Sequence, residues 1–197
     1  SWNFTTADTL APKVSITSSI EAYTNVSPIP LTVTFSESVT GFDSSEVVVT
    51  NGKVSKLSGS GTTYTMDLTP TAEGELTVSV TGNSAQDEDG NGNSESSLYK
   101  ITYDTTNPTI TISSSSGISI NSSFDATITF SEDVAGFDST DVTVTNGNFS
   151  DFTGTGDTYT LNIEPVEEGV VRLSIAANVV DDLAGNSNAQ KTEVNFT

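Results

Sequence analysis

The sequence predicts an all-β chain that consists of two tandem copies of one β-sandwich domain. The first observation is an internal repeat, because the stretch from Phe35 to Gly52 returns as Phe130 to Gly147 at an offset of 95 residues. The offset holds without a gap from Phe35 to Asn93 with about half of the positions identical, and such a fixed period marks a tandem array. The second observation is apolar–polar alternation with a period of two, and no segment keeps a helical period over three turns.

Each expected strand has one apolar and one polar face, as half-buried antiparallel strands do. In the first copy the alternating apolar residues are Val14 and Ile16; Leu31, Val33 and Phe35; Val47 and Val49; Tyr64, Met66 and Leu68; Leu76, Val78 and Val80; Tyr99, Ile101 and Tyr103. In the second copy they are Ile110 and Ile112; Ala126, Ile128 and Phe130; Val142 and Val144; Tyr159, Leu161 and Ile163; Val171, Leu173 and Ile175; Val194 and Phe196. Val54 with Leu57, and Phe149 with Phe152, indicate a further short, irregular strand.

The identical spacing of apolar positions over different side chains predicts one core design used twice. The residues expected to be buried are Phe35, Tyr64, Leu76 and Val78 in the first copy and Phe130, Tyr159, Val171 and Leu173 in the second.

Turn residues separate the expected strands. Asn51-Gly52 and Asn146-Gly147 predict two-residue hairpins, because a type I′ turn needs positive φ at both positions. The stretches 70–74 and 165–169 predict another tight reversal, with proline ending the strand before it. About seven short strands per hundred residues with regular turn signals are typical of an immunoglobulin-like sandwich. We therefore expect two tandem immunoglobulin-like β-sandwiches of about seven strands each.

The domain boundaries follow from the strand pattern. We expect residues 1–6 to be the end of a preceding repeat, residues 7–103 to form the first domain and residues 104–197 the second. The short segment between the domains contains a proline, so we expect a semi-rigid connection and domains that stand end to end. The chain opens on Trp-Asn-Phe-Thr and closes on the similar Val-Asn-Phe-Thr, which indicates a fragment of a longer array.

Composition excludes several classes of function. The 197 residues include no cysteine and no histidine, so Cys/His zinc sites, Ser–His triads and thiol chemistry are absent. The net charge of −20 excludes a phosphate-backbone partner, and no apolar run is long enough to span a membrane. Carboxylate pairs could suggest a glycosidase, but here they lie on loop tips, in duplicate and without an aromatic-lined cleft. We therefore expect that the chain is not an enzyme.

The repeated loops carry the acidic residues of greatest interest. Threading seven strands up and down brings three segments to one pole of each domain: the entry segment, the loop after the second strand and the loop before the last strand. In the second domain these segments carry Asp104; Glu132 and Asp138; and Asp182, Asn186 and Asn188. In the first domain they carry Asp8; Glu37 and Asp43; and Asp87, Asn91 and Asn93. Carboxylate and amide oxygens from three loops suit Ca²⁺, which takes six to eight oxygen ligands.

Two readings of these residues remain open. Calcium bound by Asp104, Glu132 and Asp182, with Asp138 and Asn186, would relieve the repulsion among the carboxylates and fix the domain junction. Asp and Asn residues also cap turns, so the four asparagines could be structural, and Asp43 and Asp138 could each cap one helical turn.

The acidity as a whole has two readings as well. Most carboxylates are expected to serve solubility, or adaptation to a salty medium, and only those in the repeated loops are expected to converge on cations. The loop from Asp87 to Asn93 matches the first half of an EF-hand, but its twelfth position is Leu98 instead of a bidentate glutamate. We reject the EF-hand and treat Asp89 as an optional extra ligand.

Several short sequence motifs resemble those of a known family. Asp-Thr-Thr-Asn-Pro-Thr, Phe-Ser-Glu-x-Val-x-Gly-Phe-Asp, Val-Thr-Asn-Gly, Gly-x-Gly-x-Thr-Tyr-Thr and Asp-x-x-Gly-Asn-x-Asn resemble the bacterial Ig-like repeats of giant surface adhesins. The resemblance covers nearly the whole chain, twice. It implies an extracellular place on a bacterial cell surface, an extender role and, as in several such families, calcium held between domains. The chain departs from the pattern at Asp8, where the linker reads Asp-Thr-Leu-Ala-Pro, and in its more acidic first loop.

We therefore expect a monomeric extender segment of an adhesin, with calcium as its cofactor. Its partners would be neighbouring Ig-like repeats of the same chain, and a host or surface ligand would bind through other regions, with no nucleic acid and no membrane insertion. The alternative is a module that itself binds a glycan or a host protein. An exposed aromatic cluster near a polar pocket would favour that alternative.

Overall fold

A computed structural model of the chain describes residues 8–115 and 122–197. The chain divides into two compact units, with the boundary between Asp104 and Thr105. Residues 1–6, which we expect to end a preceding repeat, lie outside the described residues, as does Ala7 at the start of the first expected domain.

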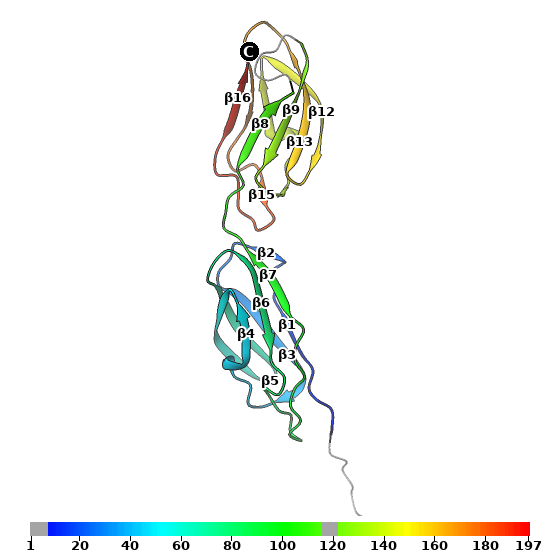
Figure 1. The fold of residues 1–197 in the computed structure, drawn as a ribbon, viewed down its shortest axis with the longest axis vertical. Helices are drawn as coiled ribbons and strands as arrows, with labels where there is room; N and C mark the ends of the chain where they lie inside the picture. Colours follow the sequence, from blue (N-terminus) through cyan, green and yellow to red (C-terminus); the bar gives the residue numbers. More distant parts are fainter. Residues whose placement is uncertain (1–7, 116–121) are drawn as a thin grey trace, which may run out of the picture. The chain divides into compact units, whose positions relative to one another are not determined.

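The first unit is a sandwich of two sheets (Figure 1). One sheet has the antiparallel order β1 (Val14–Thr17), β3 (Ile29–Val39) and β5 (Gly52–Pro70). The other has the order β2 (Tyr23–Thr24), β7 (Tyr99–Tyr103), β6 (Gly74–Val80) and β4 (Val47–Thr50), in which β2 and β7 are parallel and the other pairs are antiparallel. A 3₁₀ turn, η1 (Ser44–Glu46), precedes β4.

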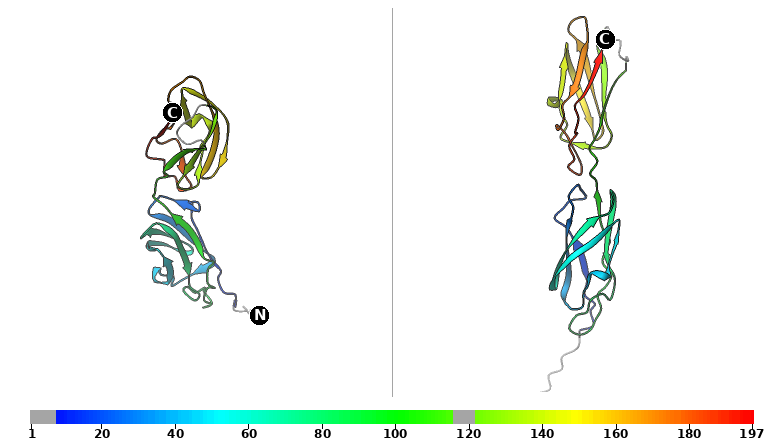
Figure 2. Two further views of the ribbon diagram at one scale, coloured as in Figure 1. Left: turned by 45° about the horizontal axis from the view of Figure 1, so that its top comes forward. Right: turned by 90° about the vertical axis from the view of Figure 1, so that its left-hand side faces the viewer.

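The second unit repeats the plan of two facing sheets (Figure 2). Its larger sheet has the order β12 (Gly147–Thr155), β13 (Thr158–Pro165), β9 (Phe124–Phe130) and β8 (Ile110–Ser114). The facing sheet is β11 (Val142–Thr145), β14 (Val171–Ile175) and β16 (Thr192–Phe196), and β10 (Val134–Ala135) pairs with β15 (Asp181–Asp182). The 3₁₀ turn η2 (Ser139–Asp141) corresponds to η1. No helix in the described ranges is long and apolar enough to cross a lipid bilayer.

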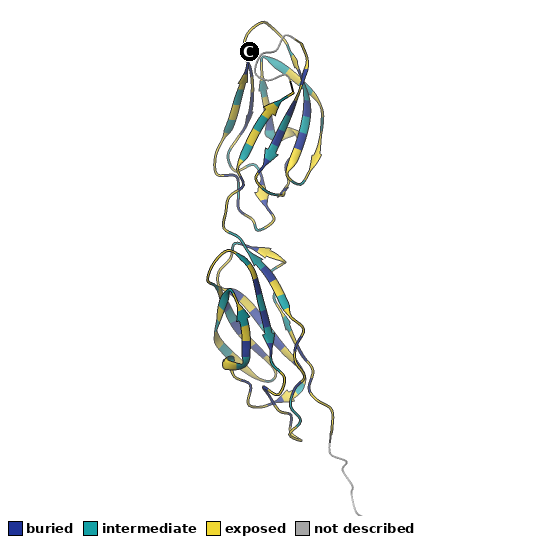
Figure 3. Cartoon of the chain, viewed as in Figure 1, coloured by how far each residue is buried: buried dark blue, intermediate teal, exposed yellow. Residues whose placement is uncertain are grey.

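Each unit has its own hydrophobic core, and the predicted all-β architecture of two tandem sandwiches is confirmed. The eight residues predicted to be core are all buried, none of them more than 7% exposed. Burial alternates along the strands as the sequence pattern predicts (Figure 3). The aromatic packing is repeated too: Phe35 meets Tyr64 edge to face with ring centroids 5.8 Å apart, and Phe130 meets Tyr159 in the same way at 5.9 Å.

The predicted Asn-Gly hairpins are wrong. Strands β4 and β5 flank Asn51-Gly52, but β4 pairs with β6 and β5 pairs with β3, so the turn connects the two sheets. Asn51 alone has positive φ, at 59°, and its side-chain amide donates to the carbonyls of Ala72 and Glu73. Asn146 repeats this arrangement in the second unit. Asparagine is therefore used here to hold the loop that follows the next strand, which a short-range turn rule does not detect.

The chain reverses instead at the Gly-x-Gly motif, between β12 and β13 in the second unit and within β5 in the first. Strands β12 and β13 pair antiparallel, and their closing pair, Thr155 with Thr158, leaves a loop of Gly156 and Asp157. Gly156 has φ of 66°, a conformation that side-chain-bearing residues rarely adopt. In the first unit the chain folds back within β5, so that Gly52 at its start lies beside Leu68 near its end. A Cβ added to Gly52 would meet Leu68 Cδ1 at 2.9 Å.

Candidate metal centre

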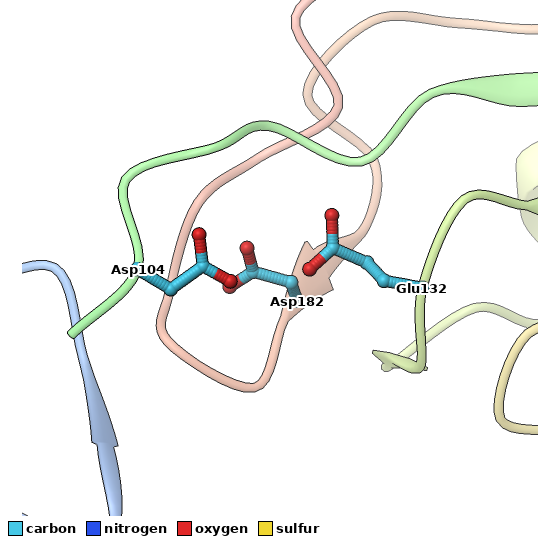
Figure 4. Close-up of side chains that lie close together, drawn as sticks. All are labelled: Asp104, Glu132 and Asp182. Carbon is cyan, nitrogen blue, oxygen red and sulfur yellow. The ribbon is translucent and has the colours of Figure 1, made fainter. Parts of the chain in front are cut away.

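Three carboxylates from distant parts of the sequence converge. Asp104, Glu132 and Asp182 each offer one oxygen atom, and these atoms all lie within 4.8 Å of one another (Figure 4). Asp104 and Glu132 are half-buried, whereas Asp182 is only 4% exposed. They are the carboxylates that the three-loop argument places together, and the structure does bring their oxygens together.

A small antiparallel pair explains why two of these loops meet. β10 follows the loop that carries Glu132, and β15 contains Asp182 itself. Val134 stands opposite Asp182 in the register of this pair, so Glu132 is only two residues along the chain from Asp182's partner. The first domain has an isolated bridge, Thr40 to Gln86, at the corresponding place. Backbone pairing thus fixes the spacing of the two side chains.

The Asp182 carboxylate is oriented by its own loop. Its Oδ1 accepts hydrogen bonds from the backbone nitrogens of Ala184, at 2.7 Å, and Asn186, at 2.9 Å. Its Oδ2 accepts a third from the side-chain nitrogen of Asn186, at 2.8 Å. Asn186 is itself buried. These donors hold a nearly buried carboxylate in one orientation, where a charge-assisted hydrogen bond is most effective.

The backbone of Asp104 is held from the other side. Its nitrogen donates to the carbonyl oxygen of Thr24 at 3.0 Å, which extends the parallel pairing of β2 with β7 by one step. Strand β2 was not predicted from the sequence, because two residues carry no alternation that could be recognised. Asp104 is thus fixed by an element 80 residues earlier in the chain.

Asp138, predicted as a further ligand, is not one of the three converging carboxylates. It is exposed and caps η2: its Oδ1 accepts from the Thr140 hydroxyl and backbone nitrogen, which together hold the pKa of Asp138 below its ordinary value. Asp141 completes a capping box by accepting from the Asp138 backbone. Asp43 caps η1 in the same way through Ser45, whose backbone and hydroxyl lower its pKa. The capping interpretation therefore describes both residues.

Asn93 and Asn188 stabilise their own loops through side-chain hydrogen bonds. Asn188 is 1% exposed, its Oδ1 accepts from Val179 and Val180, and its amide donates to the carbonyls of Ala176 and Gln190. Asn93 makes the corresponding set in the first domain. All polar atoms of the two side chains are thus directed at their own loops.

The first domain gathers its acidic residues less tightly. Asp87 accepts from both nitrogens of Asn91 at 2.8 Å, and this lowers the pKa of Asp87. The backbone of Asp8 donates to Asp89 at 3.1 Å and accepts from Asn91 at 3.0 Å. Partial burial raises the pKa of Glu37, and the charges of Asp8, Asp87 and Asp89 raise it further. Within the described ranges, only the second-domain trio has three carboxylates this close together.

The fold and this repeated loop architecture define a class of tandem Ig-like β-sandwich domains. The family model of the bacterial Ig-like domain matches residues 8–103 and again residues 104–197, so the chain belongs to this family. The family match makes Asp104 the first residue of the second domain, so the carboxylate trio lies within that match.

The chain is also similar to solved structures at low sequence identity. InvD of Yersinia pseudotuberculosis is 16% identical, with a TM-score of 0.41 over 95% of this chain and 57% of its own. The N-terminal part of the bacterial S-layer protein SbsC is 17% identical, with a TM-score of 0.35 over 95% of this chain and 44% of its own. Invasin, described as a bacterial integrin-binding protein, is 16% identical, with a TM-score of 0.34 over 95% of this chain and 39% of its own. The chain thus spans about half the length of these structures, and no curated protein sequence matches it.

Proposed function

We propose that the chain is a structural extender segment of a bacterial cell-surface adhesin, in which Ca²⁺ bound by Asp104, Glu132 and Asp182 makes the domain junction rigid. The observation that carries the proposal is the convergence of these three carboxylates. Membership of the bacterial Ig-like family, in two tandem copies, supports an extender role at the cell surface. The proposal assigns no catalysis to the chain.

The chemistry of the donor set favours calcium over other metals. All three groups are hard oxygen donors, and the chain has no histidine or cysteine to offer a transition metal. Two like charges about 4 Å apart repel by roughly 4 kcal/mol at an effective dielectric constant near 20. A divalent cation among the three oxygens would convert this repulsion into attraction, and backbone carbonyls and water would complete its coordination.

The place of Asp104 in the chain gives such an ion a mechanical effect. Asp104 follows β7 directly, so the segment that enters the second domain begins at this residue. Glu132 and Asp182 lie on loops of the second domain. An ion that binds all three would restrict the backbone at the one place where the domains are connected.

The alternative, a module that itself binds a glycan or host protein, has less support. Recognition of sugars and proteins favours exposed aromatic side chains. Among the described residues Tyr23 is the only exposed aromatic side chain, at 46%, and the remaining rings lie in or against the two cores. The surface thus lacks an aromatic cluster within the described ranges, which favours the extender.

Small-angle scattering of the full chain with Ca²⁺ and with chelator tests the proposal. We expect chelation to broaden the distribution of end-to-end distances, and Asp104→Asn to do the same in the presence of Ca²⁺. Asp151→Asn is the matched control, because it removes the same charge from an exposed position on β12. Scattering that is unaffected by chelator in the wild-type chain would show that the acidic loops are ordinary turn caps.

A further inference from the structure

We infer that Thr24 is a positioning residue of the proposed calcium site, because it fixes the backbone from which the Asp104 carboxylate extends. The inference rests on the proposed function and adds a dependence of calcium affinity on the first domain. Its basis is the hydrogen bond from the Asp104 nitrogen to the Thr24 carbonyl oxygen, 3.0 Å long.

Strand β2 is too short to be stable by itself. It pairs with β7 through only two registered residue pairs, Tyr23 with Thr102 and Thr24 with Tyr103. Two backbone hydrogen bonds reinforce it, from Thr102 to Ala22 at 2.8 Å and from Asp104 to Thr24. A pair this short needs support from side chains to keep its place at the edge of the sheet.

The side chain of Thr24 supplies this support. Thr24 is 3% exposed, and its Oγ1 accepts a hydrogen bond from the Val26 nitrogen at 3.0 Å. This bond closes a local turn directly after β2. It also gives the buried Thr24 hydroxyl a hydrogen-bond partner. Removing the hydroxyl is therefore expected to loosen the turn and the Thr24 carbonyl that receives the Asp104 nitrogen.

A ligand fixed in advance binds an ion more tightly than one on a free segment, because the ordering entropy is not lost on binding. With its backbone held by β2, Asp104 is ready to bind together with Glu132 and Asp182. Coupling between sites is reciprocal, so calcium should in turn strengthen the pairing of β2 with β7.

Calcium titration by calorimetry on the full chain tests the inference. Loss of one supporting hydrogen bond should raise the Kd for Ca²⁺ about three- to tenfold in Thr24→Ala and in Thr24→Val, which keeps the shape of the side chain. Thr24→Ser keeps the hydroxyl and should restore the Kd to within about twofold. Val49→Ala, a destabilising change elsewhere in the first domain, should leave the Kd unchanged. Amide exchange at Asp104 should slow when Ca²⁺ is added to the wild-type chain and speed up in Thr24→Ala.

The outcomes separate the two proposals. A wild-type chain that binds no calcium overturns the proposed function, and the inference with it. If the wild-type chain binds calcium and Thr24→Val binds it with the same Kd, the inference is overturned but the proposed function is not. An equal loss of affinity in Val49→Ala would also overturn it, because the effect would then reflect general stability and not the position of Asp104. If Thr24→Ala does not fold, Thr24→Val decides.

Discussion

The side-chain nitrogen of Asn186 donates to Oδ2 of Asp182 at 2.8 Å, while its backbone nitrogen donates to Oδ1 of the same carboxylate at 2.9 Å. Asn91 and Asp87 repeat this double contact in the first domain, with both distances 2.8 Å. These hydrogen bonds between an asparagine and an aspartate thus hold the loop before the last strand in both domains. They also orient the one nearly buried carboxylate of the candidate metal centre.

Replacing Asn186 should therefore weaken both the fold and the site. We expect Asn186→Ala to lower the stability of the second domain by about 1–3 kcal/mol, because it leaves the Asp182 Oδ2 without this donor. Calorimetric melting with chelator present measures the effect apart from metal binding. The matched variant Asn91→Ala should act on the first domain instead. Equal melting of wild type and Asn186→Ala would contradict the locking role.

The two 3₁₀ turns differ in one testable way. In η2, Asp141 accepts from the Asp138 backbone at 2.9 Å, whereas Glu46 at the matching position of η1 has a buried Oε2 that makes no hydrogen bond. Glu46→Asp should allow the capping box to form in the first domain and stabilise it by about 1 kcal/mol. The reverse change, Asp141→Glu, should destabilise the second domain. Melting curves of the two variants measure both changes in stability. A loss of stability in Glu46→Asp would refute this explanation.

Glu37 makes the first domain sensitive to pH. Partial burial raises its pKa above the ordinary value of 4.5, and the charges of Asp8, Asp87 and Asp89 add to the shift. A raised pKa means that the folded state favours the protonated form, so the stability contributed by Glu37 is present below about pH 4.5 and is lost as the pH rises through the folded pKa. At pH 7 without calcium, Glu37→Gln should therefore raise the melting temperature of the first domain. The gain should vanish near pH 4, and a gain of equal size at both values would argue against ionisation of Glu37 as its cause.

Alternation and repetition in the sequence were sufficient to predict the buried core residues and the architecture of two tandem sandwiches. The carboxylates Asp104, Glu132 and Asp182 could also be placed together, because strands that run alternately up and down bring every second loop to the same pole. For Asp138 the sequence leaves both a metal ligand and a helical cap open, because the residue lies on a loop at that pole. Its role depends on the Thr140 hydroxyl two residues later, which makes it a cap.

The features that were missed depend on contacts between residues distant in the sequence. The neighbouring Gly52 makes Asn51 look like a hairpin residue, whereas the Asn51 side chain holds a loop 21 residues further along the chain. No sequence pattern singles out Thr24, because only the finished fold brings its carbonyl to Asp104. Short-range rules describe the turn itself and not the element on which its side chains act.

A crystal structure grown with Ca²⁺, with anomalous scattering used to locate the ions, tests the central claim most directly. The account predicts an anomalous peak within about 2.3–2.6 Å of carboxylate oxygens from Asp104, Glu132 and Asp182. It also predicts that the peak is lost in Asp104→Asn, which removes one of the three charges. A map in which the three carboxylates have no ion at saturating Ca²⁺ would contradict the account.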